Sequence, residues 1–190
     1  LKKCFPYIKV GGYSAFGFYT ETSARFTEDV KNVPLFRTVI PKLKQFFEAI
    51  KQNGAPLDFF SWHCYAHSPE ELGECAEFIR KYLDDNGYTS AESYLTEYNT
   101  YYSLSDNPAK NKHYIAELLS GLIVAEDSSM DICFYYGLYK NSIYNGLFRY
   151  DNYNRKCVKL PPLFFSCISP STRSSSSRPQ VHAQSSQVFQ

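Results

Sequence analysis

The chain has 190 residues and a formal net charge of +1, with 21% charged and 44% hydrophobic residues. This length is enough for one globular domain with its own core. The near-zero net charge gives no basis for binding nucleic acid or an anionic membrane surface, and no apolar run is long enough to cross a bilayer. Aromatic residues reach 17%. We expect most of them to fill the core, and such rings also line sugar-binding clefts.

The cysteines are spread along the whole chain without a Cys-x-x-Cys pair: Cys4, Cys64, Cys75, Cys133, Cys157 and Cys167. This spacing argues against a disulfide framework and against a zinc site. We predict no metal and no cofactor. Scattered thiols fit a reducing compartment such as the cytoplasm. The first residues show neither an initiator Met nor a signal-peptide pattern, and we expect the chain to start within a longer protein.

The N-terminal part predicts one strand and one helix. Residues 7–13 form a strand-like run that ends in the pair Gly11-Gly12, and a long connection is expected over residues 14–32. Apolar residues then recur at helical spacing over residues 35–52. We expect the regular helix to begin at Pro41, because proline is favoured in a first turn.

The middle of the chain predicts a buried strand and a capped helix. Residues 57–65 are largely apolar on both faces at their start, as in a parallel strand covered by helices. Ser68, Pro69 and Glu71 then have the spacing of a helix start, with a serine cap and a glutamate three residues later. Asn86-Gly87 ends this helix.

The pattern continues with a strand over residues 94–102, a helix beginning at Asn107-Pro108 and a strand over residues 130–136. Alternating strands and helices predict an α/β fold with a parallel sheet and right-handed crossovers. We assign residues 1–160 to this domain. Residues 161–190 are rich in Ser, Gln, Pro and Arg, and we predict a low-complexity, disordered tail or a non-native terminus.

Polar side chains collect at the carboxyl ends of the predicted strands, where parallel α/β proteins place their sites. Strict alternation puts Leu95, Glu97 and Asn99 on one face, and a carboxylate there is costly unless it is paired or at a wet strand end. His63 and Tyr65 share a face of the preceding strand, and a tyrosine hydroxyl could hold a neighbouring carboxylate ionised. The plain alternatives are a solvated glutamate and a hydrogen-bonded core histidine.

Two motifs carry a family resemblance: Ser61-Trp62-His63-Cys64-Tyr65 and, further along, Thr96-Glu97-Tyr98-Asn99-Thr100. They resemble glycoside hydrolase family 39, the β-xylosidase and α-L-iduronidase family within the clan of retaining (β/α)₈ glycosidases. The resemblance covers roughly residues 5–165. It implies that the four strands are strands five to eight of the barrel, so that the chain is the C-terminal half of a (β/α)₈ TIM barrel and incomplete.

The resemblance also implies roles for individual residues. Glu97 would be the nucleophile, attacking the anomeric carbon of a glycoside or oligosaccharide to form a glycosyl-enzyme intermediate. The other implied residues would contact a β-linked sugar or wall its site, and those on the preceding strand would also orient the nucleophile: His63, Tyr65, Asn99, Tyr135 and Tyr136. Tyr98 stands where the family commonly has Phe and Tyr101 where it commonly has Ser, which bears on substrate contacts.

A retaining glycosidase also needs a second carboxyl group, the acid/base, about 5 Å from the nucleophile. In the clan this residue follows an Asn at the end of the fourth strand, but the sequence contains no Asn-Glu pair. Four strands also do not close an eight-stranded barrel. We therefore expect the N-terminal half of the barrel to be a missing partner, and this chain alone to be inactive.

Two other interpretations remain open. The chain could belong to a non-catalytic carbohydrate-binding or scaffold protein that has kept the mouth of the barrel. It could also be an independent four-stranded parallel domain in which Glu97 is merely solvated.

Overall fold

The computed structural model describes residues 2–22, 34, 36–100, 112–137, 148–151, 156–159 and 180–183. Its main sheet contains five parallel strands in the order β1-β2-β3-β4-β7. These are β1 (Gly11–Phe16), β2 (Phe59–Ala66), β3 (Glu92–Thr100), β4 (Ile132–Tyr135) and β7 (Gln180–Ala183). The predicted four parallel strands in chain order are therefore confirmed.

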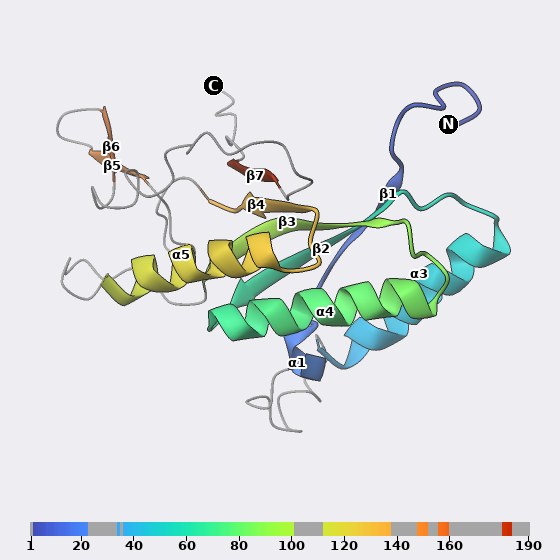
Figure 1. The fold of residues 1–190 in the computed structure, drawn as a ribbon, viewed down its shortest axis with the longest axis horizontal. Helices are drawn as coiled ribbons and strands as arrows, with labels where there is room; N and C mark the ends of the chain where they lie inside the picture. Colours follow the sequence, from blue (N-terminus) through green and yellow to red (C-terminus); the bar gives the residue numbers. More distant parts are fainter. Residues whose placement is uncertain are drawn as a thin grey trace.

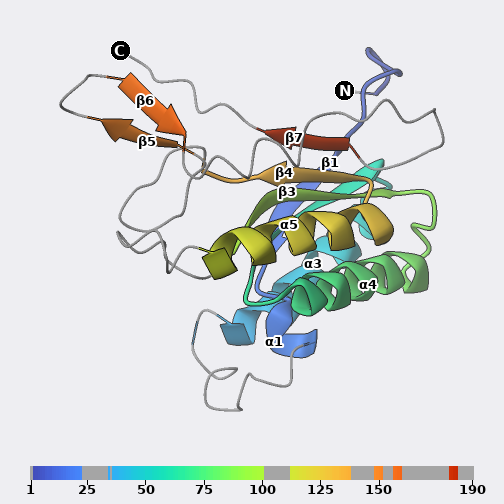
Figure 2. The ribbon, with the colours of Figure 1, turned by 60° about the vertical axis from the view of Figure 1, so that its left-hand side comes forward.

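A helix lies in each crossover between the first four strands, which is what parallel pairing requires. They are α3 (Val39–Gln52), α4 (Pro69–Asp85) and α5 (Lys112–Asp127), and α1 (Tyr19–Thr22) and a 3₁₀ turn at Phe36–Thr38 precede the first of them. Figures 1 and 2 show these helices on one and the same face of the sheet. A doubly wound sheet would carry helices on both faces. One-sided cover instead defines a partial α/β barrel.

The helix boundaries follow the local signals in the sequence. The backbone N–H of Glu71 donates to the Ser68 hydroxyl at 3.3 Å, and the Glu71 carboxylate accepts from the N–H of His67 at 2.7 Å. Pro41 lies in the first turn of α3, and Asn53 caps its end before Gly54, whose φ is +56°. The predicted start of the third helix at residues 107–108 lies outside the described residues.

The core lies between the sheet and the helices. Trp62 on β2 is fully buried, and its indole N–H donates to the hydroxyl of Ser93 on β3 at 3.0 Å. This bond satisfies a polar group that would otherwise be costly to bury. The helices contribute the following buried side chains: Leu43, Phe47, Leu72, Ile79, Leu83 and Leu118.

The first strand begins where we expected it to end. Gly11 pairs with Phe59 at the start of β1, so the glycine pair opens the strand. A Cβ at Gly11 would lie 2.0 Å from the Phe59 carbonyl oxygen, so glycine allows the two backbones to approach. The Tyr13 ring lies on the helix-covered face, where it packs on Phe46 of α3 with centroids 4.8 Å apart.

Two features of the C-terminal region were not predicted. β5 (Phe148–Asp151) and β6 (Lys156–Lys159) form a separate antiparallel pair. β7 lies within residues 161–190, beside β4, and the rest of that segment is outside the described residues, so the disordered tail stays a prediction. Among the helices that the structure describes, none is long and apolar enough to cross a membrane.

Candidate active site

The position of Glu97 depends on a bulge in β3. Leu95 pairs with Trp62 but Glu97 pairs with His63, so Thr96 is an extra residue outside the pairing register, and its hydroxyl donates to the Trp62 carbonyl at 3.2 Å. Leu95 is fully buried on the helix-covered face, and the bulge turns Glu97 to the opposite face. The prediction that Leu95, Glu97 and Asn99 share a face is therefore wrong for Leu95, because strict alternation does not continue through a bulge.

His63, Tyr65 and Glu97 lie together at the carboxyl ends of β2 and β3. We call them the Glu97 cluster. The Tyr65 hydroxyl donates to Glu97 Oε2 at 2.7 Å, and His63 Nδ1 lies 3.4 Å from the same oxygen. The Glu97 side chain is 28% exposed and that of His63 is 19% exposed. Glu97 is therefore partly desolvated and held by a phenol, and its open side is free to meet a ligand.

The charge state of His63 follows from its burial. Burial lowers the pKa of His63 from its ordinary value, and the negative charge of Glu97 offsets part of that effect. His63 is then a neutral imidazole at neutral pH, with one nitrogen that donates and one that accepts.

We expect this lowered pKa to make stability depend on pH. The unfolded chain binds a proton at His63 at higher pH than the folded chain does, so acid favours unfolding. The contribution is fully present above about pH 6.5, the ordinary value, and is lost as the pH falls toward the lower folded-state pKa. Lowering the pH from about 7.5 to about 5.5 should lower the Tm of the wild type more than the Tm of His63→Gln, as measured by thermal melting. Parallel Tm curves for the two proteins would contradict this assignment.

Asn99 is fully buried and joins β3 to the segment after β4. Its amide Nδ2 donates to the Tyr136 carbonyl at 2.8 Å, and its Oδ1 accepts from the N–H of Thr100 at 2.7 Å. The N–H of Tyr136 donates to the Tyr98 carbonyl at 2.9 Å. The Tyr136 ring meets the Tyr65 ring edge-on, with centroids 6.1 Å apart. Asn99 thus positions Tyr136 against the tyrosine that holds Glu97.

Tyr135 and Tyr98 lie on the other face of the sheet. They pair with each other across β3 and β4, and both are buried. The Tyr135 and Tyr114 hydroxyls lie 2.6 Å apart in a hydrogen bond beneath α5, and burial raises the pKa of Tyr135 to about 12. The expectation that Tyr135 walls the sugar site is therefore not met, because strand alternation turns it toward the helix. For the same reason Tyr98 is no substrate contact, and Tyr101 is outside the described residues.

The pairing register brings one further residue to the level of Glu97. Phe16 on β1 pairs with His63, which pairs with Glu97. Phe16 falls within the connection predicted over residues 14–32, because the sequence predicts that the first strand ends at the glycine pair. The available signal was the alternation of Phe16 and Phe18 with the small residues Ala15 and Gly17.

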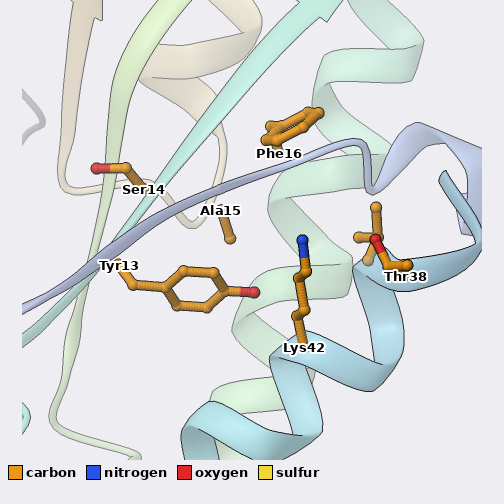
Figure 3. Close-up of a pocket in the computed structure, with 7 residues that line it drawn as sticks. Tyr13, Ser14, Ala15, Phe16, Thr38 and Lys42 are labelled. Atoms are coloured by element: carbon orange, nitrogen blue, oxygen red, sulfur yellow. The ribbon is translucent and has the colours of Figure 1, made fainter. Parts of the chain in front are cut away.

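A pocket of about 190 Å³ lies between β1 and the start of α3, and its lining includes Phe16 but none of His63, Tyr65 and Glu97. Figure 3 shows the Tyr13 hydroxyl and the Lys42 ammonium pointing into it. Burial raises the pKa of Tyr13. Among the described residues, no group of three or more His, Cys, Asp or Glu is arranged to hold a metal ion.

The fold is similar to part of a solved glucosidase. A glucosidase from Croceicoccus marinus superimposes with a TM-score of 0.52 and 24% sequence identity over 70% of this chain. The chain spans only 25% of that glucosidase chain. No protein-family model and no curated protein matches the sequence. At this level of identity the similarity concerns the fold, and it agrees with a partial α/β barrel.

Proposed function

We propose that this chain carries the nucleophile of a retaining glycoside hydrolase, and that Glu97 is that residue. One observation carries the proposal. A carboxylate at the carboxyl edge of a parallel sheet accepts a 2.7 Å hydrogen bond from Tyr65, with His63 Nδ1 at 3.4 Å, on the face that the described helices leave open. The fold similarity to a glucosidase supports this class of enzyme.

The contacts of Glu97 suit nucleophilic attack on a sugar. Tyr65 donates to Oε2, which leaves Oε1 for attack on the anomeric carbon. A bond forms between the carboxylate and that carbon while the bond to the leaving oxygen breaks, which gives a glycosyl-enzyme intermediate. Neutral His63 would bind a hydroxyl of the same sugar ring.

The finer assignment rests on the resemblance to glycoside hydrolase family 39. It favours β-linked sugars, xylosides in particular, as substrates. The sequence has no Asn-Glu pair to supply the acid/base. The proposal therefore gives this chain half of the catalytic pair and assigns the other carboxyl group to the N-terminal half of a barrel. Hydrolysis of ordinary aryl xylosides by this chain alone should be undetectable, because nothing protonates their leaving group.

The proposal can be tested by covalent labelling with a reagent whose leaving group needs no proton. We expect 2,4-dinitrophenyl 2-deoxy-2-fluoro-β-xyloside to label the protein once, because dinitrophenolate leaves unaided and the fluorine slows loss of the sugar. Intact-mass measurement should find the fluoroxylosyl group on the wild type and not on Glu97→Gln. Glu92→Gln is the matched control, since Glu92 lies on the same strand and binds Lys9, and it should label normally.

Two outcomes would contradict the proposal. One is labelling of Glu97→Gln at the rate of the wild type. The other is hydrolysis of aryl xylosides that Glu97→Gln leaves unchanged. Sugar binding by the wild type without any labelling would instead favour a non-catalytic carbohydrate-binding protein.

A further inference from the structure

We propose that Phe16 is an aromatic platform against which the bound sugar packs, and that it is a substrate-binding residue of the same site. This inference rests on the proposed function. It starts from the pairing register, which places Phe16, His63 and Glu97 side by side on three adjacent strands. Neighbouring strands lie about 4.8 Å apart, so Phe16 is about 10 Å along the row from Glu97.

The ring of Phe16 lies on the same face of the sheet as Glu97. Ala15 pairs with Trp62 and is 2% exposed beneath the helices, and Phe16 follows it directly in the strand. Successive residues of a strand point to opposite faces. In Figure 3 the Phe16 and Ser14 side chains lie on the opposite side of the β1 ribbon from those of Tyr13 and Ala15, and all four residues border the pocket beside the start of α3.

The ring is also open to a ligand. Phe16 is 42% exposed, although it follows a buried residue in the strand. Tyr13 and Phe18, three and two residues away, pack their rings on Phe46 and Phe78 respectively. Among the described residues, by contrast, no aromatic ring packs on Phe16. Single exposed apolar residues are common on protein surfaces. Here the exposed ring of Phe16 is at the same level of the sheet as the His63 imidazole and the Glu97 carboxylate. An aromatic ring beside polar groups of this kind suits the binding of a sugar.

The geometry suits a pyranose ring. A sugar whose anomeric carbon meets Glu97 extends across His63 toward Phe16. The C–H groups on one face of such a ring are weakly positive and pack against the negative face of a phenyl ring. This contact forms in the bound substrate as well as in the transition state, so it contributes uniform binding rather than rate.

The test separates binding from chemistry. We expect Phe16→Ala to raise the KI for inactivation by the dinitrophenyl fluoroxyloside about tenfold and to leave the maximal inactivation rate within about twofold of the wild type. Phe16→Trp should keep the wild-type KI, because an indole offers the same kind of face. Phe5→Ala is the control, since Phe5 is 47% exposed and lies outside the strand, and it should behave as the wild type.

An equilibrium readout accompanies the kinetics. The single native tryptophan, Trp62, is fully buried, so the tryptophan of Phe16→Trp should dominate any change in fluorescence when methyl β-xyloside is added. Labelling of the wild type with an unchanged KI in Phe16→Ala would overturn this inference and leave the role of Glu97 intact. Failure of the wild type to label would overturn the proposed function and, with it, this inference.

Discussion

Gly11→Ala should destabilise the protein by about 3 kcal/mol, near the upper end of the cost of overpacking a well-packed site. The new Cβ would lie 2.0 Å from the carbonyl oxygen of Phe59 and 2.7 Å from its ring. A backbone oxygen on a paired strand cannot rotate away as a side chain can, so β1 must separate from β2 at its first pair. Urea unfolding measures the loss, and faster hydrogen exchange in β1 locates it.

The neighbouring glycine supplies the control for this prediction. A Cβ at Gly12 would meet nothing within 4 Å, although Gly12 pairs with Phe60 in the same strand. Gly12→Ala should therefore change the free energy of unfolding by no more than about 0.5 kcal/mol. Equal losses in the two variants would mean that the close approach of Gly11 to Phe59 does not determine the start of β1.

Gly121→Ala should destabilise the protein by about 2 kcal/mol, although alanine is the better helix former by about 1 kcal/mol. Gly121 lies in α5 directly above Tyr98, and a Cβ there would come within 1.9 Å of the tyrosine hydroxyl oxygen. Tyr98 is 1% exposed, so its ring has no room to retreat. Glycine at this position thus makes room for the buried hydroxyl of Tyr98.

The partner substitution separates this clash from a general effect on the helix. In a Tyr98→Phe background the nearest atom to the new Cβ becomes the ring carbon at 2.8 Å, so the cost of Gly121→Ala should fall by about 1 kcal/mol. Gly73→Ala is the control in α4, where the Cβ would lie 3.3 Å from a Val124 methyl group. It should stay within about 1 kcal/mol of the wild type. Equal costs of Gly121→Ala in both backgrounds would exclude the contact with Tyr98 as the cause.

The sequence was sufficient to predict the cluster at the carboxyl edge of the sheet. His63 with Tyr65, and Glu97, end adjacent strands of a parallel sheet, and such ends meet at one edge. The helix signals were local as well, as at Ser68 and Glu71, where each partner is within four residues of the other. Local signals of this kind depend on spacing and propensity, which a single sequence displays.

The orientation of individual side chains was less predictable, because it depends on pairing between strands. The bulge at Thr96 reverses the face of every residue that follows it, and no local propensity marks the extra residue. Without the bulge, Glu97 would point into the core with Leu95. The orientation of Tyr135 also depends on strand pairing, because Tyr135 pairs with Tyr98 on β3 and lies on the same face of the sheet. The start of β1 depends on a contact between Gly11 and Phe59, which are far apart in the sequence.

The most direct test of the account is to locate the fluoroxylosyl label in the protein sequence. Trypsin releases residues 82–110 as one peptide, which contains both Glu92 and Glu97. We predict that fragmentation of the labelled peptide places the added sugar on Glu97. A label on Glu92, or on any other peptide, would show that the carboxylate held by Tyr65 is not the nucleophile.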